Sequence, residues 1–160
     1  MGRNVTAEPL RPVDVAQVDV RTDPRHLPFD APEANTTTTW DRRDVLWLGP
    51  DEWLVVGDAG EEDEILRAFG DALAGTHASM LDVSANRIVF DLADALGLLS
   101  TACGLDLDPT RWTPGVCAQT LLGQAQVILH QRDERTTRIF VRPSFAGYLV
   151  DRLRSAAPLS

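Results

Sequence analysis

Short apolar runs separated by turn-forming residues dominate the first part of the chain and predict β-structure. Residues 13–20, VDVAQVDV, carry valines at alternating positions towards their end, which is typical of a short strand of the kind found at a sheet edge. Residues 23–34 contain three prolines, which remove backbone donors, so we expect an extended loop there. The β-prone segment NTTTTW at residues 35–40 leads into another strand.

The segment LWLGPDEWLVVG joins two apolar, β-prone runs through a short polar bend. Pro50 suits the second position of a turn, because its φ is already set near −65°. Trp47 and Trp53 lie at about the same distance from the bend, so we expect them on one face of a hairpin. Asp51 and Glu52 raise the question of a catalytic acid pair, but turn chemistry alone accounts for both residues.

Helical periodicity occurs in three segments. Residues 61–75, EEDEILRAFGDALAG, place apolar residues on one stripe, and the leading acids suit the positive end of a helix dipole. A second helix is expected from about Leu92 to Cys103, with Cys103 facing the core. A third is expected from about Pro143, because proline is tolerated at the first helical position.

The remaining apolar runs predict further strands. They lie at residues 80–93 with a bend near 84–86, at 116–131 with a bend at 123–124, and at 136–141. This order of elements predicts an α+β fold with an antiparallel or mixed sheet and about three helices on one side. We expect residues 1–40 to form an N-terminal arm with an edge strand and a proline-rich loop, and residues 41–156 to form a single α+β domain.

Composition excludes some classes of partner. The chain has 160 residues, 44% of them hydrophobic, which is enough for a real core. Its net charge is −9 and all 15 of its Lys and Arg residues are arginine, so a nucleic-acid partner is not expected. The N-terminus has no signal-peptide h-region, and no apolar run approaches the roughly 18 residues of a membrane span. We expect a cytoplasmic protein with Cys103 and Cys117 as reduced thiols.

The sequence contains no recognisable set of catalytic residues. His26, His77 and His130 lack a metal-type spacing to a second ligand, and His130, at a predicted strand end, is expected to be solvated. Glycine-rich phosphate loops and nucleophile elbows are absent from the sequence. Ser84 lies near Asp82 but has no candidate base. The sequence therefore predicts no catalytic, cofactor-binding or metal-binding residue in this chain.

The four tryptophans can be core residues, but tryptophan and arginine are also enriched at the energetic centres of interfaces. We therefore predict a subunit interface that draws on Trp47, Trp53, Arg87, Arg111 and Trp112. Trp112, which follows Arg111 in a loop, is the residue that we most readily place at a partner surface.

Four segments, in this order, resemble the gamma subunit of heterotetrameric sarcosine oxidase. They are LWLGPDEWLVV, DVSANRIVFDLADALGLLSTACGLDLDP, PGVCAQTLLGQAQVILH and RIFVRPSFAGYLVDRL, and they span roughly residues 44 to 154. The resemblance implies a non-catalytic subunit that supports assembly with alpha, beta and delta subunits. Enzymes of that family oxidise sarcosine to glycine and hydrogen peroxide, and pass the one-carbon unit to tetrahydrofolate or release it as formaldehyde.

The same resemblance implies that the cofactors lie elsewhere in the assembly. In that family the alpha subunit binds NAD and carries the folate domain, and beta binds FAD. A covalent FMN lies between alpha and beta, and delta binds zinc. No cofactor is expected in this chain.

A more distant resemblance connects the chain to the folate-binding domain of the glycine-cleavage T-protein. DVSANRIVFDLADALGLL resembles the strand and helix of that family that begin with DVS. The T-protein family then has a longer hairpin with a functional acid, whereas the bend from Gly123 to Gln126 contains none. We expect a folate-type scaffold without its chemistry. Two alternatives stay open, a freestanding folate-binding or aminomethyl-transfer protein and an assembly module of a related N-methyl amine oxidase.

Overall fold

The computed structural model describes residues 10–156, and the contacts of the chain divide it into two compact units. We call residues 14–86 the N-terminal unit. Among the described residues, the C-terminal unit contains residues 87–156 together with residues 10–13. Each unit has a β-sheet of its own and a hydrophobic core of its own.

This division differs from the expected one, in which residues 1–40 form an arm and residues 41–156 a single domain. Residues 40 and 41 fall inside the N-terminal unit, at a hairpin in which Trp40 pairs with Arg43. The two turn residues, Asp41 and Arg42, both have positive φ, as a tight hairpin turn requires. This turn was not predicted, because its two central residues are not the Asn-Gly or Asp-Gly that usually mark such a hairpin.

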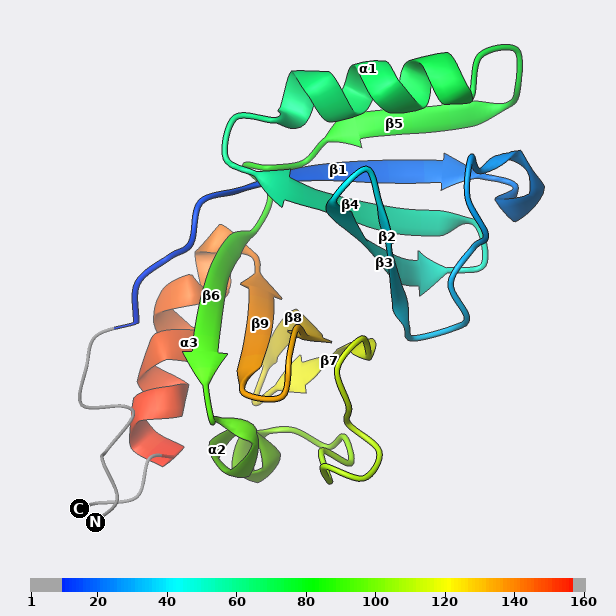
Figure 1. Ribbon diagram of the computed structural model, residues 1–160. Coiled ribbons are helices and arrows are strands. Elements are labelled where there is room, and N and C mark those ends of the chain that lie inside the picture. The colour runs from blue at the N-terminus through cyan, green and yellow to red at the C-terminus, as the bar shows by residue number, and fades with distance from the viewer. Residues whose placement is uncertain (1–9, 157–160) are drawn as a thin grey trace. The chain divides into compact units, whose positions relative to one another are not determined.

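The N-terminal unit is built on a five-stranded antiparallel sheet with the order β2-β3-β4-β1-β5. Its strands are β1 (Val15–Thr22), β2 (Thr37–Trp40), β3 (Arg43–Gly49), β4 (Glu52–Asp58) and β5 (Ala78–Asp82). The proline-rich loop between β1 and β2 contains one short 3₁₀ turn, η1 (Pro24–His26). Figure 1 shows β1 between β4 and β5.

The expectation that the first strand is an edge strand is wrong. β1 pairs with β4 on one side and with β5 on the other. Val18 and Val20 are fully buried on one face, and Gln17, which points to the other face, is almost fully buried as well. A strand that is buried on both faces belongs inside a sheet, and the polar residues of VDVAQVDV conceal this in the sequence.

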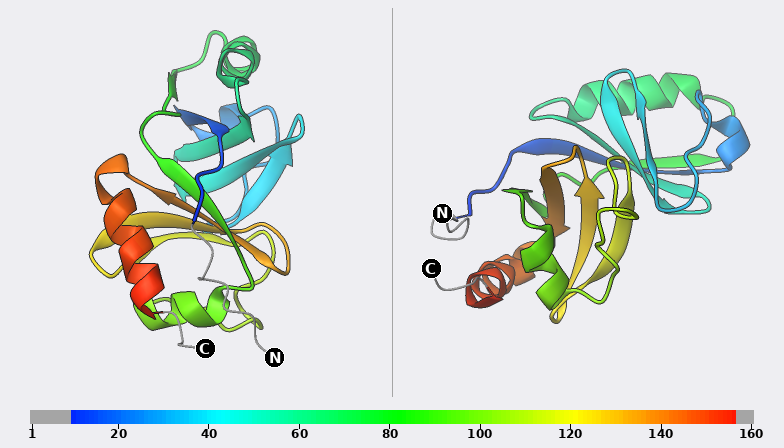
Figure 2. Two further views of the ribbon diagram at one scale, coloured as in Figure 1. Left: turned by 90° about the vertical axis from the view of Figure 1, so that its left-hand side faces the viewer. Right: turned by 60° about the horizontal axis from the view of Figure 1, so that its bottom comes forward.

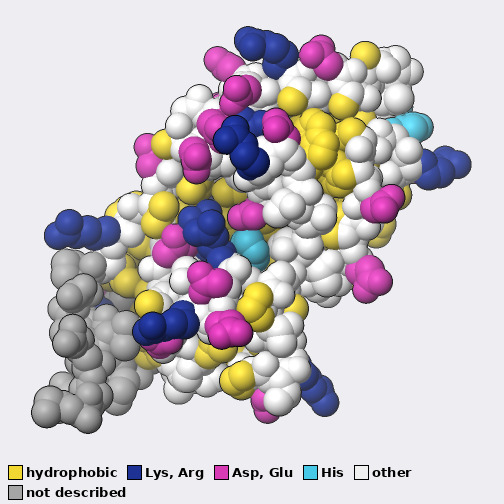
Figure 3. Space-filling model, viewed as in Figure 1, with side chains coloured by type: hydrophobic (Ala, Val, Ile, Leu, Met, Phe, Trp, Pro, Cys, Tyr) yellow, Lys and Arg dark blue, Asp and Glu magenta, His cyan; other side chains and the backbone are white. Residues whose placement is uncertain are grey.

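Helix α1 (Glu62–Ala72) covers one face of this sheet and packs against β1 and β5. Ile65 and Phe69 are buried under it, and Phe69 contacts the ring of Trp40 edge-on with the ring centroids 4.6 Å apart. Phe29, from the proline-rich loop, joins the same aromatic group. These ring contacts attach the proline-rich loop to the core. Apolar side chains are visible beside α1 in the space-filling view (Figure 3).

The C-terminal unit is built on a four-stranded antiparallel sheet with the order β6-β9-β8-β7. Its strands are β6 (Ile88–Ala93), β7 (Cys117–Leu122), β8 (Ala125–Gln131) and β9 (Thr136–Val141). The predicted bend near residues 84–86 is confirmed as the break between β5 and β6, which belong to different sheets.

Two helices, α2 (Leu96–Ala102) and α3 (Pro143–Ala156), cover one face of this second sheet (Figure 2). Leu99 of α2 and Leu149 and Leu153 of α3 are buried against the strand residues of the core. Helix α2 is shorter than predicted, because the residues before Leu96 complete β6 and a bend. Cys103 follows α2 and packs half-buried on this core, as its spacing predicts.

The predicted α+β class with antiparallel sheets and three α-helices is confirmed for the described residues, although there are two sheets in place of one. Within residues 10–156 no helix combines the length and the apolar composition that crossing a membrane would need.

Candidate functional site

The bend that contains Asp51 and Glu52 is a hairpin turn, as predicted. β3 and β4 pair antiparallel, with Trp47 directly opposite Trp53, and the register shifts between Trp47 and Gly49. Asp51 is exposed, and its backbone carbonyl accepts a hydrogen bond from the amide of Thr22 at 3.0 Å. The turn therefore ties the hairpin to the end of β1.

Glu52 does not form an acid pair with Asp51 but belongs to a surface ion cluster. The guanidinium of Arg21 lies 3.2 Å from Glu52 and 3.4 Å from Asp19. Partial burial raises the pKa of Glu52 above its ordinary value, and the nearby carboxylate of Asp19 raises it further, against the opposing effect of Arg21. The cluster links β1 to β4, with an exposed Arg21 between two partly buried carboxylates, which is the arrangement of a structural ion pair.

The hollow beside the hairpin turn holds the first two histidines. Asp51, His26 and His77 line an open hollow of about 620 Å³ at the end of β1. Thr22 at its edge donates its hydroxyl to the carbonyl of His77 at 3.0 Å. Across residues 10–156, no three His, Cys, Asp or Glu side chains gather in a way that could hold a metal ion. This hollow therefore lacks a metal-ligand set within the described residues.

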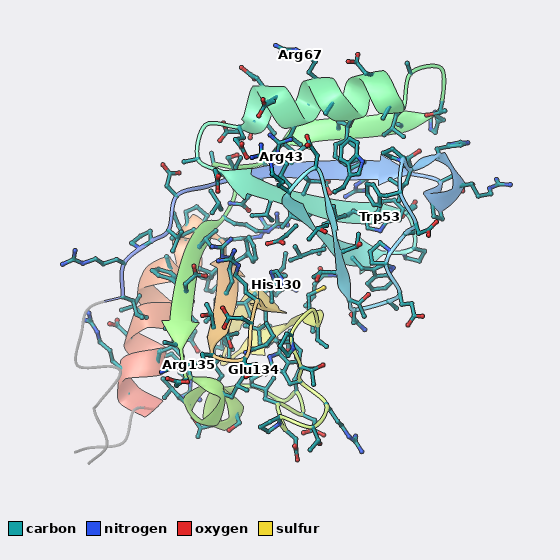
Figure 4. All side chains as sticks on the ribbon, viewed as in Figure 1. Arg43, Trp53, Arg67, His130, Glu134 and Arg135 are labelled. Carbon is teal, nitrogen blue, oxygen red and sulfur yellow. The ribbon has the colours of Figure 1, made fainter. Side chains whose placement is uncertain are left out.

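His130 lies in a polar row that crosses the second sheet. The strand register sets Cys117, His130, Arg138 and Asp91 side by side on β7, β8, β9 and β6. The expectation that His130 is solvated is wrong, because β8 continues past it and its side chain is buried (Figure 4). Both carboxylate oxygens of Asp91 accept hydrogen bonds from Arg138, at 2.8 and 2.9 Å. Asp91, the acid in this row, therefore forms a cross-strand ion pair with Arg138.

Trp112 is buried and hydrogen-bonded inside the C-terminal unit. Its side chain is only 5% exposed and belongs to the core of the C-terminal unit. The indole N–H donates to Oε1 of Gln131 at 2.9 Å, and the hydroxyl of Thr137 donates to the same oxygen at 2.6 Å. The amide nitrogen of Gln131 in turn donates to the carbonyl of Asp133 at 2.7 Å. This buried network fixes the long loop after α2 to β8 and β9.

The five residues predicted for a subunit interface are separated into two groups by their burial. Trp53 and Trp112 are 1% and 5% exposed, so they have almost no surface to offer a partner. Trp47 and Arg87 are half-buried, and Arg111 is exposed and lies 3.5 Å from Asp106 in an ion pair. The interface stays a prediction for these last three residues.

Arg87 lines a groove of about 650 Å³ on the second sheet. This groove was not predicted from the sequence. Leu121 pairs with Gln126 across β7 and β8. Val141 pairs with Val127 on one side and Ile88 on the other, and Arg142 and Arg87 lie just beyond these pairs, where β9 ends and β6 begins. The positions of these residues relative to one another depend on the strand register. In the sequence, only the alternation of residues within each strand could have indicated that they share a face.

The hairpin bend between β7 and β8 lies at the edge of this groove and is attached to α3. Gly123 has a φ of +58°, and the amide of Gln124 donates to the hydroxyl of Tyr148 at 2.9 Å. A Cβ atom at Gly123 would lie 2.3 Å from that hydroxyl oxygen. Glycine is therefore required both by the backbone conformation and by the close approach of α3.

Comparison with known proteins gives a consistent result. Residues 18–158 match the model of the sarcosine oxidase, gamma subunit family. The chain is 34% identical over 110 residues to sarcosine oxidase subunit gamma of Corynebacterium sp. (strain P-1), and 37% identical over 109 residues to that of Corynebacterium sp. (strain U-96). Each match covers 66% of this chain and 52% of the relative, so the chain spans about half the length of the relatives it matches.

Solved structures agree with the family match. A chain of the heterotetrameric sarcosine oxidase from Corynebacterium sp. U-96 in complex with pyrrole 2-carboxylate superimposes with a TM-score of 0.81 and 29% identity. The match covers 92% of this chain and 82% of that one. Aminomethyltransferase T of the glycine cleavage system from Bartonella henselae has a TM-score of 0.69 at 14% identity, over 90% of this chain and 44% of that one, which shows a shared fold. The family match extends over most of the sequence, and the chain belongs to the sarcosine oxidase gamma subunit family.

Proposed function

We propose that this chain is a non-catalytic subunit that supports the assembly of a multi-subunit sarcosine oxidase. The observation that carries the proposal is the likeness to a chain of a heterotetrameric sarcosine oxidase, which extends over 92% of this chain with a TM-score of 0.81. A chain that keeps the fold over nearly its full length is suited to the same structural place in an assembly.

The ion pairs of two buried arginines support a structural role. Buried Arg43 is held by Asp41, Glu61 and Glu64, and buried Arg138 is held by Asp91. Buried charges that are fully paired are the expected state of structural groups, whereas catalytic groups need an unsatisfied position that faces substrate. The bend from Gly123 to Gln126 also contains no acid that could act on a folate nitrogen.

The partners proposed for the assembly are alpha, beta and delta subunits. The assembled enzyme would oxidise the methyl group of sarcosine in the cytoplasm and transfer the one-carbon unit to tetrahydrofolate. FAD, FMN, NAD and zinc would be bound by the partner subunits. The chain would contribute its folded surfaces to this assembly and no reacting group of its own.

The test is an affinity purification of the tagged chain from its native host, with mass spectrometry of the proteins that accompany it. The proposal expects a yellow assembly, coloured by flavin, that releases hydrogen peroxide when sarcosine is added. A colourless protein that purifies alone from cells grown on sarcosine would contradict it. Saturable quenching of its tryptophan fluorescence by tetrahydrofolate would then favour a freestanding folate-binding protein.

A further inference from the structure

The groove on the second sheet combines positive charge with apolar surface. Its lining includes the Leu121–Gln126 pair of β7 and β8, together with Arg142 at the end of β9 and Arg87 at the start of β6. The next row on the same face, also defined by the strand register, contains Gln119, Ile128 and Phe140, which line the groove as well. Arginine and glutamine side chains therefore border a floor of apolar residues.

The charge of this groove is opposite to that of the chain. The whole protein carries a net charge of −9, with 24 acidic residues. The described residues that line the groove nevertheless include two arginines and no Asp or Glu. Arg87 directly precedes β6 and Arg142 directly follows β9, next to the Ile88–Val141 pair, and the exposed guanidinium of Arg142 can bind a carboxylate.

The apolar part of the groove is accessible at its edge. Leu121 is 50% exposed, which makes it one of the few large hydrophobic side chains that the described residues leave open to solvent. Arginine is enriched at protein–protein interfaces, and Leu121 adds apolar area at the other end of the same groove. Small-molecule sites are instead mainly apolar, whereas this hollow is partly open and has a largely polar lining.

We propose that this groove binds an acidic segment of a partner subunit. A carboxylate side chain of that segment is held by Arg142, the amide of Gln126 donates to it, and a neighbouring apolar side chain packs on Leu121. This inference rests on the proposed function, because it names the chemistry of one contact within the assembly. Electrostatic complementarity of this kind selects the partner and sets its orientation.

The test is a measurement of the affinity of the full chain for the complex of the other subunits, prepared without it. Gln126→Glu places an acid inside the groove, and Gln124→Glu makes the same change at the exposed hairpin tip, which does not line it. Arg142→Glu reverses a charge in the groove, and Arg67→Glu reverses one on the outer side of α1 (Figure 4). Each pair of variants alters the net charge of the chain equally.

The proposal expects Gln126→Glu and Arg142→Glu to weaken binding at least about tenfold, with Gln124→Glu and Arg67→Glu close to wild type. Raising the salt concentration should weaken the wild type more than Arg142→Glu. Equal affinities within each pair, with all four variants folded by circular dichroism, would overturn it. A change in self-association without a change in partner affinity would also overturn it, because the occupant would be a second copy of this chain.

Failure of this inference is distinguishable from failure of the proposed function. If the wild-type chain itself does not bind the other subunits, the subunit role fails. If the wild type binds and the groove variants bind equally well, only the assignment of the groove fails.

Discussion

At the scale of single residues, burial and hydrogen bonding distinguish structural side chains from those that can meet a partner. Trp112 has the sequence context of an exposed loop residue, yet its indole N–H is satisfied inside the protein by Gln131. Trp53 is also buried, and it pairs with Trp47 across the hairpin. An aromatic residue in a loop is therefore not evidence of an interface until its burial is known.

We expect Trp112→Phe to lower the free energy of unfolding by about 1–3 kcal/mol, because Oε1 of Gln131 loses one of its two donors while it stays buried. Urea denaturation of the isolated chain measures this. Trp40→Phe, which keeps an aromatic ring beside Phe69, is the matched control. A Trp112→Phe chain with unchanged stability but weaker binding to its partner subunits would show that Trp112 is an interface residue after all.

Arg43 gives a prediction for the pH dependence of stability. Burial by itself lowers the pKa of Arg43, but the hydrogen bonds and charges of Glu61, Glu64 and Asp41 raise it above its ordinary value (Figure 4). The hydrogen bond from Arg43 in turn holds the pKa of Glu61 below its ordinary value. For a carboxylate with a lowered pKa, the stabilisation is present above the pKa of the unfolded chain and is lost as the pH falls through that of the folded protein.

We therefore expect the wild-type chain to lose stability as the pH falls below about 4.5, the ordinary pKa of a glutamate. Arg43→Met should be less stable than wild type at neutral pH, and its stability should depend less on pH in this acidic range. Unfolding free energies measured at a series of pH values test both statements. Parallel pH profiles for the two proteins would show that the ion cluster does not contribute.

At the scale of elements, the hairpin between β7 and β8 is held in place by α3. The hydroxyl of Tyr148 accepts a hydrogen bond from the bend, and Gly123 at that bend has a φ of +58°. Because the bend lines the groove, its position also determines the shape of the groove.

We expect Gly123→Ala to lower the free energy of unfolding by at least about 1 kcal/mol, because a Cβ atom meets the hydroxyl of Tyr148 and the backbone has positive φ. Gly97→Ala is the control, because Gly97 lies in α2 with open space around it, and alanine should stabilise that helix by up to about 1 kcal/mol. Thermal or urea unfolding of both variants provides the measurement. Equal stabilities of the two variants would contradict the predicted contact.

Elements that depend on local signals could be predicted from the sequence, and elements that depend on distant partners could not. The turn at Pro50 and the apolar stripe of α1 are local, and both are found in the structure. The central place of β1 depends on its pairing with β4 and β5, which are far along the chain. The burial of His130 and the positions of Arg142 and Arg87 relative to each other depend on strand register in the same way. Sequence periodicity indicates which face of a strand a residue occupies, but not which distant strand lies beside it.

At the scale of the whole molecule, the proposed role is that of a folded support for an enzyme whose chemistry lies in other subunits. The chain belongs to the sarcosine oxidase gamma subunit family and keeps its fold over 92% of its length. Its buried ionisable side chains Arg43 and Arg138 are held in ion pairs inside their own units. A subunit of this kind should influence the stability of the assembly more than the intrinsic chemistry of its flavin sites.

The most direct measurement is the reconstitution of the enzyme with and without this chain, followed by sarcosine-dependent release of hydrogen peroxide and by the half-life of the assembly on heating. The account predicts that the remaining subunits assemble poorly or lose activity quickly, and that adding the purified chain restores both properties. An assembly without the chain that is equally active and equally stable would contradict the account.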